Sequence, residues 1–506
     1  MPAYLRPADA DCPTYVDDTE WHPLVDGAAY FDELLAATED LGDGDALLIG
    51  NLAVDPWLDL RGRAPGQPGY EAFGERLARA AAAGATVRVL LAGRVLASTL
   101  PVAGLGDFRK NALHAQELRS WQPAGHGGDP PLEGRVLVDF SGSLPGANHQ
   151  KVVVVSRAGE LTAFVGGIDL EPDRRDAAPH DTLRYRNARW GWHDAVVRLR
   201  GPGATRVWDV LARRWDEAAT LPGKHFVRRP PRWEELNPGV AQPTPPSRPP
   251  QSPVTAAAGT QVQVLRSIPR HKFTSALPGR TIEWNALPRT GVHEIYETLS
   301  TAIGEARRYV YLEDQYLGEE LGADHSYELY GRLRDAARRG VKVIMLGSGI
   351  RDPADPGIHL RQINRKLNRD LRRKVVDGLG AHRANVAVYR LEHCTVHAKL
   401  FLIDDAFACI GSANLFSRSM GGVDNELACA VQTTTSLVRD LRVRVWGEHL
   451  RAPSSPQLRG ALEDLDTALG IWDTRWLPPL ASSLTWRAPG TPPGYAPTET
   501  VLHRVD

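Results

Sequence analysis

An internal duplication constrains the fold of this 506-residue chain most strongly, because three kinds of segment occur twice and in the same order. The first is a short apolar run, the second an amphipathic helix followed by glycine and an apolar run, and the third two apolar runs ending in small residues. In that order the paired segments are 46–56 and 309–320, 73–93 and 329–349, and 148–170 and 396–415. Short apolar runs of this kind predict buried strands.

Strand–helix–strand units favour an α/β fold, so we expect two similar α/β halves, each a mixed central sheet flanked by helices. The predicted halves are residues 1–229 and 254–480. Between them, residues 230–253 hold nine prolines and predict an extended linker. Residues 481–506 predict a proline-rich tail. Gly84 and Gly340 fit helix C-caps. The sequence favours neither one hydrophobic core shared by the two halves nor a separate core in each half.

Composition is that of an ordinary globular protein, with 42% hydrophobic and 24% charged residues. The net charge of −1 makes nucleic acid an unlikely partner for the chain as a whole. Four cysteines without a CxxC pair suggest free thiols rather than a zinc or redox motif. The sequence has neither a signal-peptide pattern nor an apolar run of 18 residues, so a cytoplasmic location is expected.

The third repeat carries the chemistry, because it places His149 and Lys151 in one half and His397 and Lys399 in the other. Residues two apart on a strand share a face. An imidazole and an ammonium leaving an apolar strand together are costly unless an anion meets them. One such pair arises easily by chance, whereas two in matching places indicate a site.

A loop of small residues follows each pair and would let backbone N–H groups approach a ligand closely. Its members are Gly166, Gly167 and Asp169 in the first half, and Ser412 and Asn414 in the second. Two histidines, two lysines and an asparagine suit a phosphodiester, because lysines neutralise its oxygens while one imidazole attacks and the other protonates. We therefore expect no cofactor and no metal, and the sequence has no HExxH motif or similar ligand spacing.

These motifs, HQKVVVV with FVGGIDL and HAKLFLIDD with GSANL, resemble those of the phospholipase D superfamily over about residues 47–448, the linker excepted. The segments 312–316 (LEDQY) and 192–215 are also similar to members that act on phospholipids.

The resemblance implies that the halves face each other across a pseudo-two-fold axis and form one site. In it His149 is the nucleophile that forms a phosphohistidine, and His397 is the acid and then the base. Glu426 would orient His149, and Asp194 would orient His397. The implied phosphate contacts are Lys151, Lys399, Asn414 and Ser412.

The chain departs from the family pattern in the first half. Asp404 completes the second motif, H-x-K-x-x-x-x-D, but Ser156 stands at the matching first-half position. In the family this Asp supports local structure, so its loss need not abolish catalysis. Gly167 stands where some members place Asn or Ser, which implies that this half contacts phosphate through Lys151 and backbone alone.

The sequence thus predicts a monomeric phospholipase D-like phosphodiesterase or phosphatidyltransferase acting on a phospholipid, with water or an alcohol as acceptor. A nuclease, another phosphodiesterase or a non-catalytic lipid-binding or phosphate-binding member are the alternatives. Residues 359–379 predict a basic helix, which is either a solvated face or a contact with an anionic membrane surface. Tryptophans that either line the site entry or pack in the core are Trp57, Trp121, Trp190 and Trp192.

Overall fold

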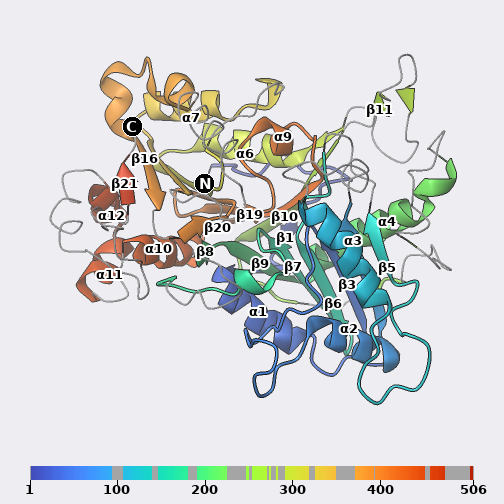
Figure 1. Ribbon diagram of the computed structural model, residues 1–506. Coiled ribbons are helices and arrows are strands. Elements are labelled where there is room, and N and C mark those ends of the chain that lie inside the picture. Colours follow the sequence, from blue (N-terminus) through green and yellow to red (C-terminus); the bar gives the residue numbers. More distant parts are fainter. Residues whose placement is uncertain are drawn as a thin grey trace.

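A computed structural model describes residues 2–93, 106–139, 146–180, 191–224, 237, 247–249, 254–269, 273–274, 281–282, 291–317, 325–348, 371–391, 394–450, 456–472 and 502–504. Two large β-sheets lie within these residues, one built from each half of the chain (Figure 1). The predicted linker and tail lie almost wholly outside the described residues, as do residues 359–370 of the predicted basic helix and Trp190.

The first sheet contains seven strands. Across the sheet they are β2 (Glu20–Val25), β9 (Ala195–Arg200), β7 (Glu160–Gly166), β6 (Val152–Arg157), β3 (Ala46–Asn51), β4 (Thr86–Ala92) and β5 (Val136–Asp139). The neighbours β3, β4 and β5 are parallel, and the other pairs are antiparallel. The sheet is therefore mixed, as expected.

The second sheet repeats this order with β10 (Thr260–Ile268), β20 (Glu426–Thr433), β19 (Phe407–Gly411), β18 (Leu400–Ile403), β14 (Tyr309–Asp314), β15 (Lys342–Ser348) and β16 (Val386–Leu391). Again the last three strands are mutually parallel. Additional strands at its margins are β1 (Tyr15–Val16), β13 (Val292–His293) and β21 (Leu502–Arg504). Because β1 pairs with β10, the start of the chain crosses over to the second half.

Two short sheets complete the strands. In one of these sheets β8 (Gly191–His193) pairs with β17 (Cys394–Val396), so this sheet joins the two halves. The other is a hairpin of β11 (Phe273–Thr274) and β12 (Thr281–Ile282). The shared strand order agrees with two similar α/β halves. The axis expected to relate them stays a prediction.

Helices cover the sheets and divide the apolar residues into layers. The helices are α1 (Asp26–Ala37), α2 (Phe73–Ala82), α3 (Gly106–Arg119), α4 (Pro202–Lys224), α6 (Glu294–Glu305), α7 (Tyr330–Arg338), α9 (Ser417–Met420), α10 (Leu437–His449), α11 (Pro456–Glu463) and α12 (Leu465–Trp472). Four shorter helical segments are η1 (Pro172–Arg174), η2 (His325–Tyr327), η3 (Arg372–Val376) and η4 (Gly380–Asn385). None of these described helices is both long and apolar enough to cross a bilayer.

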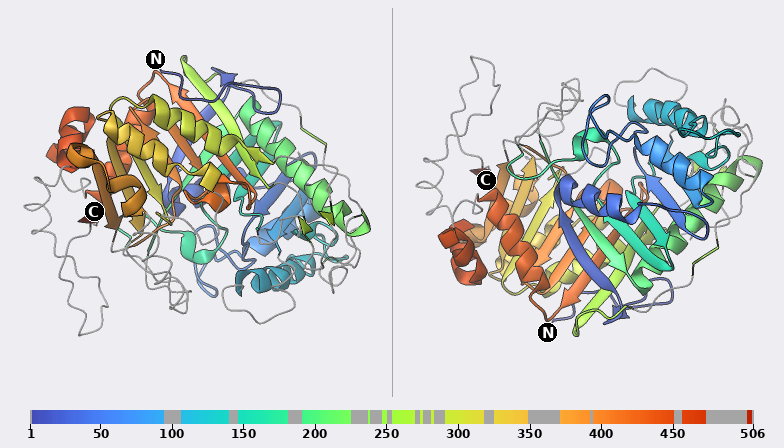
Figure 2. Two further views of the ribbon diagram at one scale, coloured as in Figure 1. Left: turned by 90° about the horizontal axis from the view of Figure 1, so that it is seen from above. Right: turned by 90° about the horizontal axis from the view of Figure 1, so that it is seen from below.

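A central core joins the halves, which answers the question that the sequence left open. Strands β7 and β9 of the first sheet lie against β19 and β20 of the second, and α4 and α10 pack into the same cluster (Figure 2). Each half also has an outer core under its own helices. The halves are therefore packed on each other along their sheets.

The predicted helix caps are confirmed. Gly84 and Gly340 follow the ends of α2 and α7 with φ of +99° and +94°, a conformation that side chains disfavour. All four cysteines are buried free thiols, as expected.

Asp404 links the hairpin of the second motif to the start of β14. Its carboxylate accepts the backbone N–H groups of Arg307, Arg308 and Tyr309 at 2.7–2.9 Å and the hydroxyl of Tyr4. In the first half the two segments exchange their parts: the carboxylate lies before the strand, and the N–H group lies in the hairpin turn. There Asp45, just before β3, accepts the N–H of Ala158 in the β6–β7 turn at 2.9 Å. The first motif therefore keeps a strand-to-hairpin link although Ser156 replaces its Asp.

We expect Asp404→Ala to lower the free energy of unfolding by about 2–4 kcal/mol, because it leaves several N–H groups without their charged acceptor. Ser156→Ala is the matched control. No side-chain hydrogen bond of Ser156 is seen among the described residues, so it should change stability by less than about 1 kcal/mol. Urea unfolding of both variants makes the comparison. Equal losses would contradict the structural role given to Asp404.

Candidate active site

The two His-x-Lys segments lie immediately before β6 and β18 rather than inside them, which corrects the expected strand positions. The backbone still continues the sheet, since the carbonyl groups of Lys151 and Lys399 accept N–H groups at the ends of β7 and β19. Each histidine is also paired through its backbone with the other half. The N–H of His149 donates to Asn425, and the N–H of His397 donates to His193.

Each imidazole is held by a carboxylate from the opposite half. Nδ1 of His149 lies 3.1 Å from both carboxylate oxygens of Glu426, and Nδ1 of His397 lies 2.7 Å from Oδ2 of Asp194. The structure thus brings together the pairs that the resemblance implied. Neither Nε2 atom has a hydrogen-bond partner among the described residues. A carboxylate at Nδ1 fixes the tautomer that leaves Nε2 as the reacting nitrogen.

Burial and charge act differently on the two carboxylates. Burial would raise the pKa of Glu426, but His149 and the hydroxyls of Ser412 and Ser419 outweigh it and lower the pKa. Burial raises the pKa of Asp194, and the charge of Lys399 offsets this only in part. The surroundings therefore favour the charged form of Glu426, whereas burial disfavours the charged form of Asp194.

Both lysines are buried beside their histidines. Nζ of Lys151 donates to the carbonyl of His149 at 2.9 Å, and Nζ of Lys399 donates to the carbonyl of His397. Burial lowers the pKa of Lys399 to about 8. Nearby carboxylates compensate these buried ammonium groups in part, and a bound anion would compensate them further.

The same cations act on His397. Burial lowers the pKa of this histidine well below its usual value, and the charges of Lys399, Arg174 and Lys151 lower it further. A bound phosphodiester would offset these charges and raise the pKa again. The proton on His397 is thereby coupled to the presence of an anionic substrate.

In the small-residue loops, one predicted phosphate contact, Ser412, makes a different contact. The hydroxyl of Ser412 donates to Oε2 of Glu426 at 2.5 Å, so Ser412 positions the carboxylate instead of facing a phosphate. Gly167 leaves room for Asp194, because a Cβ there would lie 2.1 Å from its Oδ1. Gly166 is packed against the backbone of Ala195.

The ends of the two loops differ in charge. Asn414 is buried, and its Oδ1 has no hydrogen-bond partner among the described residues; only its Nδ2 group could donate to a phosphate oxygen. Its first-half counterpart is Asp169, whose Oδ1 lies 3.7 Å from Nζ of Lys151. Asp314 at the end of β14 accepts the N–H of Leu415 at 2.7 Å, and burial raises its pKa to about 7.

The sequence did not predict a cation–aromatic contact that lies beside His397. The guanidinium of Arg174 lies 3.5 Å from the ring centre of Trp192, and that ring meets His397 edge-on at 5.3 Å. Trp192 therefore lies at the site, as one interpretation had it. Trp57 and Trp121 instead contact each other at 4.8 Å. Arg174 had no signal in the sequence, because it belongs to neither motif.

Comparison with known proteins identifies similar chains. The family model described as "Cardiolipin synthase, PLD-like domain" matches residues 299–445. Phospholipase D alpha 1 of Zea mays is 25% identical over 79% of this chain and 60% of its own length. Phospholipase D alpha 4 of Arabidopsis thaliana is 25% identical over 60% of this chain and 48% of its own. The chain thus spans about 60% of the maize relative and about half of the other.

A solved structure shares the fold. It is phosphatidylserine synthase of Haemophilus influenzae Rd KW20, with a TM-score of 0.53 and 11% identity over 82% of this chain and 83% of that chain. At this identity the likeness concerns the fold alone.

Proposed function

The chain belongs to the phospholipase D superfamily, and on that premise we propose that it cleaves a phospholipid phosphodiester through a phosphohistidine, with water or an alcohol as acceptor. The observation that carries this proposal is the reciprocal pairing of two histidines with carboxylates of the opposite halves, beside two buried lysines. The phospholipase D relatives support the choice of a phospholipid.

In the first step Nε2 of His149 attacks phosphorus, and the bond from phosphorus to the headgroup oxygen breaks. His397 gives its proton to that oxygen, so the headgroup leaves as an alcohol. Glu426 stabilises the charge that develops on His149. Lys151 and Lys399 would balance the negative charge on the non-bridging oxygens, and the side-chain NH2 group of Asn414 would donate a hydrogen bond to one of them.

In the second step His397 removes a proton from water or an alcohol, whose oxygen attacks the phosphohistidine. The phosphorus–nitrogen bond breaks, and His149 returns to its starting form. Hydrolysis and transfer differ only in the acceptor oxygen.

The test is a panel of phospholipids with zwitterionic and anionic headgroups, in mixed micelles with and without ethanol. We expect headgroup release, a phosphatidylethanol product when ethanol is present, and loss of both in His149→Asn. Both should continue in EDTA, since lysines supply the charge stabilisation at phosphorus. If no lipid reacts but a nucleic acid is cleaved, and His149→Asn abolishes that cleavage, the substrate assignment is wrong and the site is right.

A further inference from the structure

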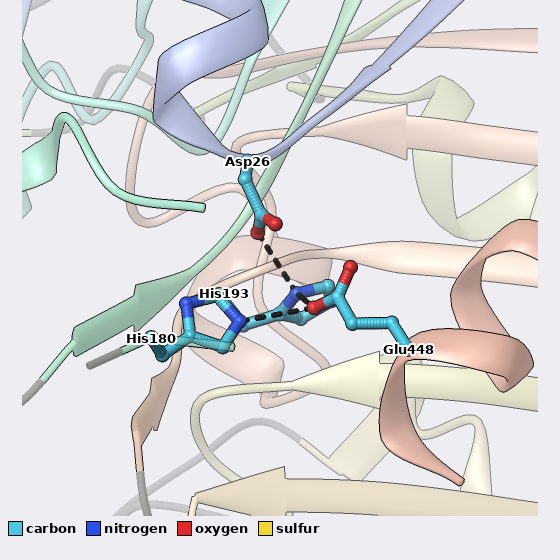
Figure 3. A group of neighbouring side chains, drawn as sticks. All are labelled: Asp26, His180, His193 and Glu448. Carbon is cyan, nitrogen blue, oxygen red and sulfur yellow. Dashed lines mark hydrogen bonds and ion pairs between the residues drawn. The ribbon is translucent and has the colours of Figure 1, made fainter. Parts of the chain in front are cut away.

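A second cluster of titratable side chains lies behind Asp194 and is not used by the proposed reaction. Asp26, His180, His193 and Glu448 each offer one nitrogen or oxygen atom, and these atoms all lie within 4.8 Å of one another (Figure 3). The first three are buried and come from the first half. Glu448 comes from α10 of the second half, and its side chain is 10% exposed.

The contacts inside this cluster are close but not all are hydrogen bonds. Nδ1 of His193 lies 2.8 Å from Oε1 of Glu448 and 3.0 Å from Oδ1 of Asp26. Nδ1 carries at most one proton, so it can donate to only one of these two oxygens at a time. Nε2 of His180 lies 3.0 Å from the same Glu448 oxygen. Two carboxylates thus converge on one imidazole nitrogen, and a single N–H cannot satisfy both.

The other nitrogen of each ring is held by a further carboxylate. Nδ1 of His180 lies 2.9 Å from Oδ2 of Asp176, and Nε2 of His193 lies 2.8 Å from Oε2 of Glu313. Metal-binding histidines nearly always donate their second N–H to such a group, which fixes the tautomer and the ring. Glu313 also accepts a hydrogen bond from His449 through its other oxygen, so both of its contacts have hydrogen-bond geometry and need no ion.

Asp26 adopts an unusual backbone conformation at the start of α1. Its φ is +67°, which is uncommon for a residue with a side chain, and its N–H donates to the carbonyl of Asp194 at 2.8 Å. Strain of this kind persists where the surrounding structure requires one side-chain direction. Here that direction brings the carboxylate to His193.

We propose that Asp26, His180, His193 and Glu448 bind one divalent cation of the zinc class in a tetrahedral site. Two imidazoles and two carboxylates are ligands that zinc accepts, and the two carboxylates neutralise its charge. Zinc–ligand bonds of about 2.0–2.2 Å put tetrahedral ligand atoms about 3.3 Å apart. The closest pairs would therefore separate by a few tenths of an ångström on binding.

The coordination and the position of this site predict a structural role for the ion rather than a catalytic one. Four protein ligands leave no open coordination position, so the ion would not activate a substrate. It would instead fix the strand that carries His193, whose carbonyl accepts the N–H groups of His397 and Ala398. Because Glu448 belongs to the other half, the ion would also tie the halves together beside the carboxylate that holds His397.

The test is the zinc content of the purified full chain, measured by mass spectrometry after desalting. We expect about one zinc per chain that native dialysis against EDTA removes slowly and that denaturant with EDTA removes at once. Refolding with cobalt(II) should give the strong visible absorption of a four-coordinate ion. His180→Cys should shift that spectrum through a new sulfur-to-cobalt transition, which a merely structural role for His180 would not do.

Glu448→Gln should lose most of the metal, whereas Glu294→Gln should keep it. Glu294 is a fair control because it is a buried carboxylate ion-paired with Arg266 outside the cluster. A folded chain that takes up neither zinc nor cobalt would overturn the proposal and leave a hydrogen-bonded charge network. Equal metal content in both variants would place the ion elsewhere and overturn it as well. Neither outcome depends on phospholipid cleavage.

Discussion

With phosphatidyl-p-nitrophenol as substrate, His397→Asn is expected to release a burst of nitrophenolate and then stall, whereas His149→Asn is expected to give no burst. Nitrophenolate is a stable anion that needs little protonation to leave, so the first step tolerates the loss of the acid. Breakdown of the phosphohistidine still needs a base to activate water. Rapid-quench measurement of nitrophenolate separates the two steps.

Natural phospholipids should show no such asymmetry, because an alkoxide headgroup must be protonated as it leaves. Either substitution should lower turnover by several orders of magnitude, on the order of 10³–10⁶. The double variant should be little worse than either single one, since the two histidines act as a unit.

The same nitrophenolate measurement also tests the two carboxylates that orient the histidines. Glu426→Gln should behave as a weak His149 variant, and Asp194→Asn as a weak His397 variant, because each acts through the ring it holds. A burst from His149→Asn and none from His397→Asn would mean that the two roles are assigned the wrong way round. It would leave the shared site intact.

Much of this arrangement was predictable because duplication is a strong signal. Apolar runs in matching order indicated two mixed sheets, and the glycines after α2 and α7 indicated where helices end. The carboxylate partners of His149 and His397 followed only from the family resemblance. No spacing in the sequence relates residue 149 to 426 or 194 to 397, since these pairs form between halves.

Other features depend on side-chain directions that the sequence does not encode. Ser412 was expected at phosphate, but its hydroxyl turns to Glu426. Asp45 makes a link that the motif pattern assigns to position 156, because the carboxylate can sit on either side of one contact. In the first case a residue makes another contact than expected, and in the second another residue makes the expected contact.

The cluster around His193 was also beyond the reach of sequence spacing. Its four members come from separate segments, and one lies in the opposite half of the chain. Metal motifs are recognised by short spacings on one helix or loop. A site assembled across a domain interface has none.

Gly167→Ala is expected to lower turnover of natural phospholipids by about 10²–10³-fold, within the range that general acid–base catalysis contributes. An added Cβ would lie 2.1 Å from Oδ1 of Asp194, and real Cβ contacts are never that close. The carboxylate must therefore move away from His397. Because Asp194 acts through His397, the nitrophenolate burst should persist while steady turnover falls, as in Asp194→Asn.

Two controls separate this effect from general damage. Gly203→Ala also crowds its surroundings, with a Cβ 2.6 Å from the side chain of Thr19, but does so in α4. Gly304→Ala in α6 meets nothing within 4 Å and should be neutral or slightly stabilising. Thermal unfolding should show a cost of about 1–3 kcal/mol for the two crowded variants. If Gly167→Ala then loses no more turnover than Gly203→Ala, the position of Asp194 does not control His397, and the second histidine works without its carboxylate.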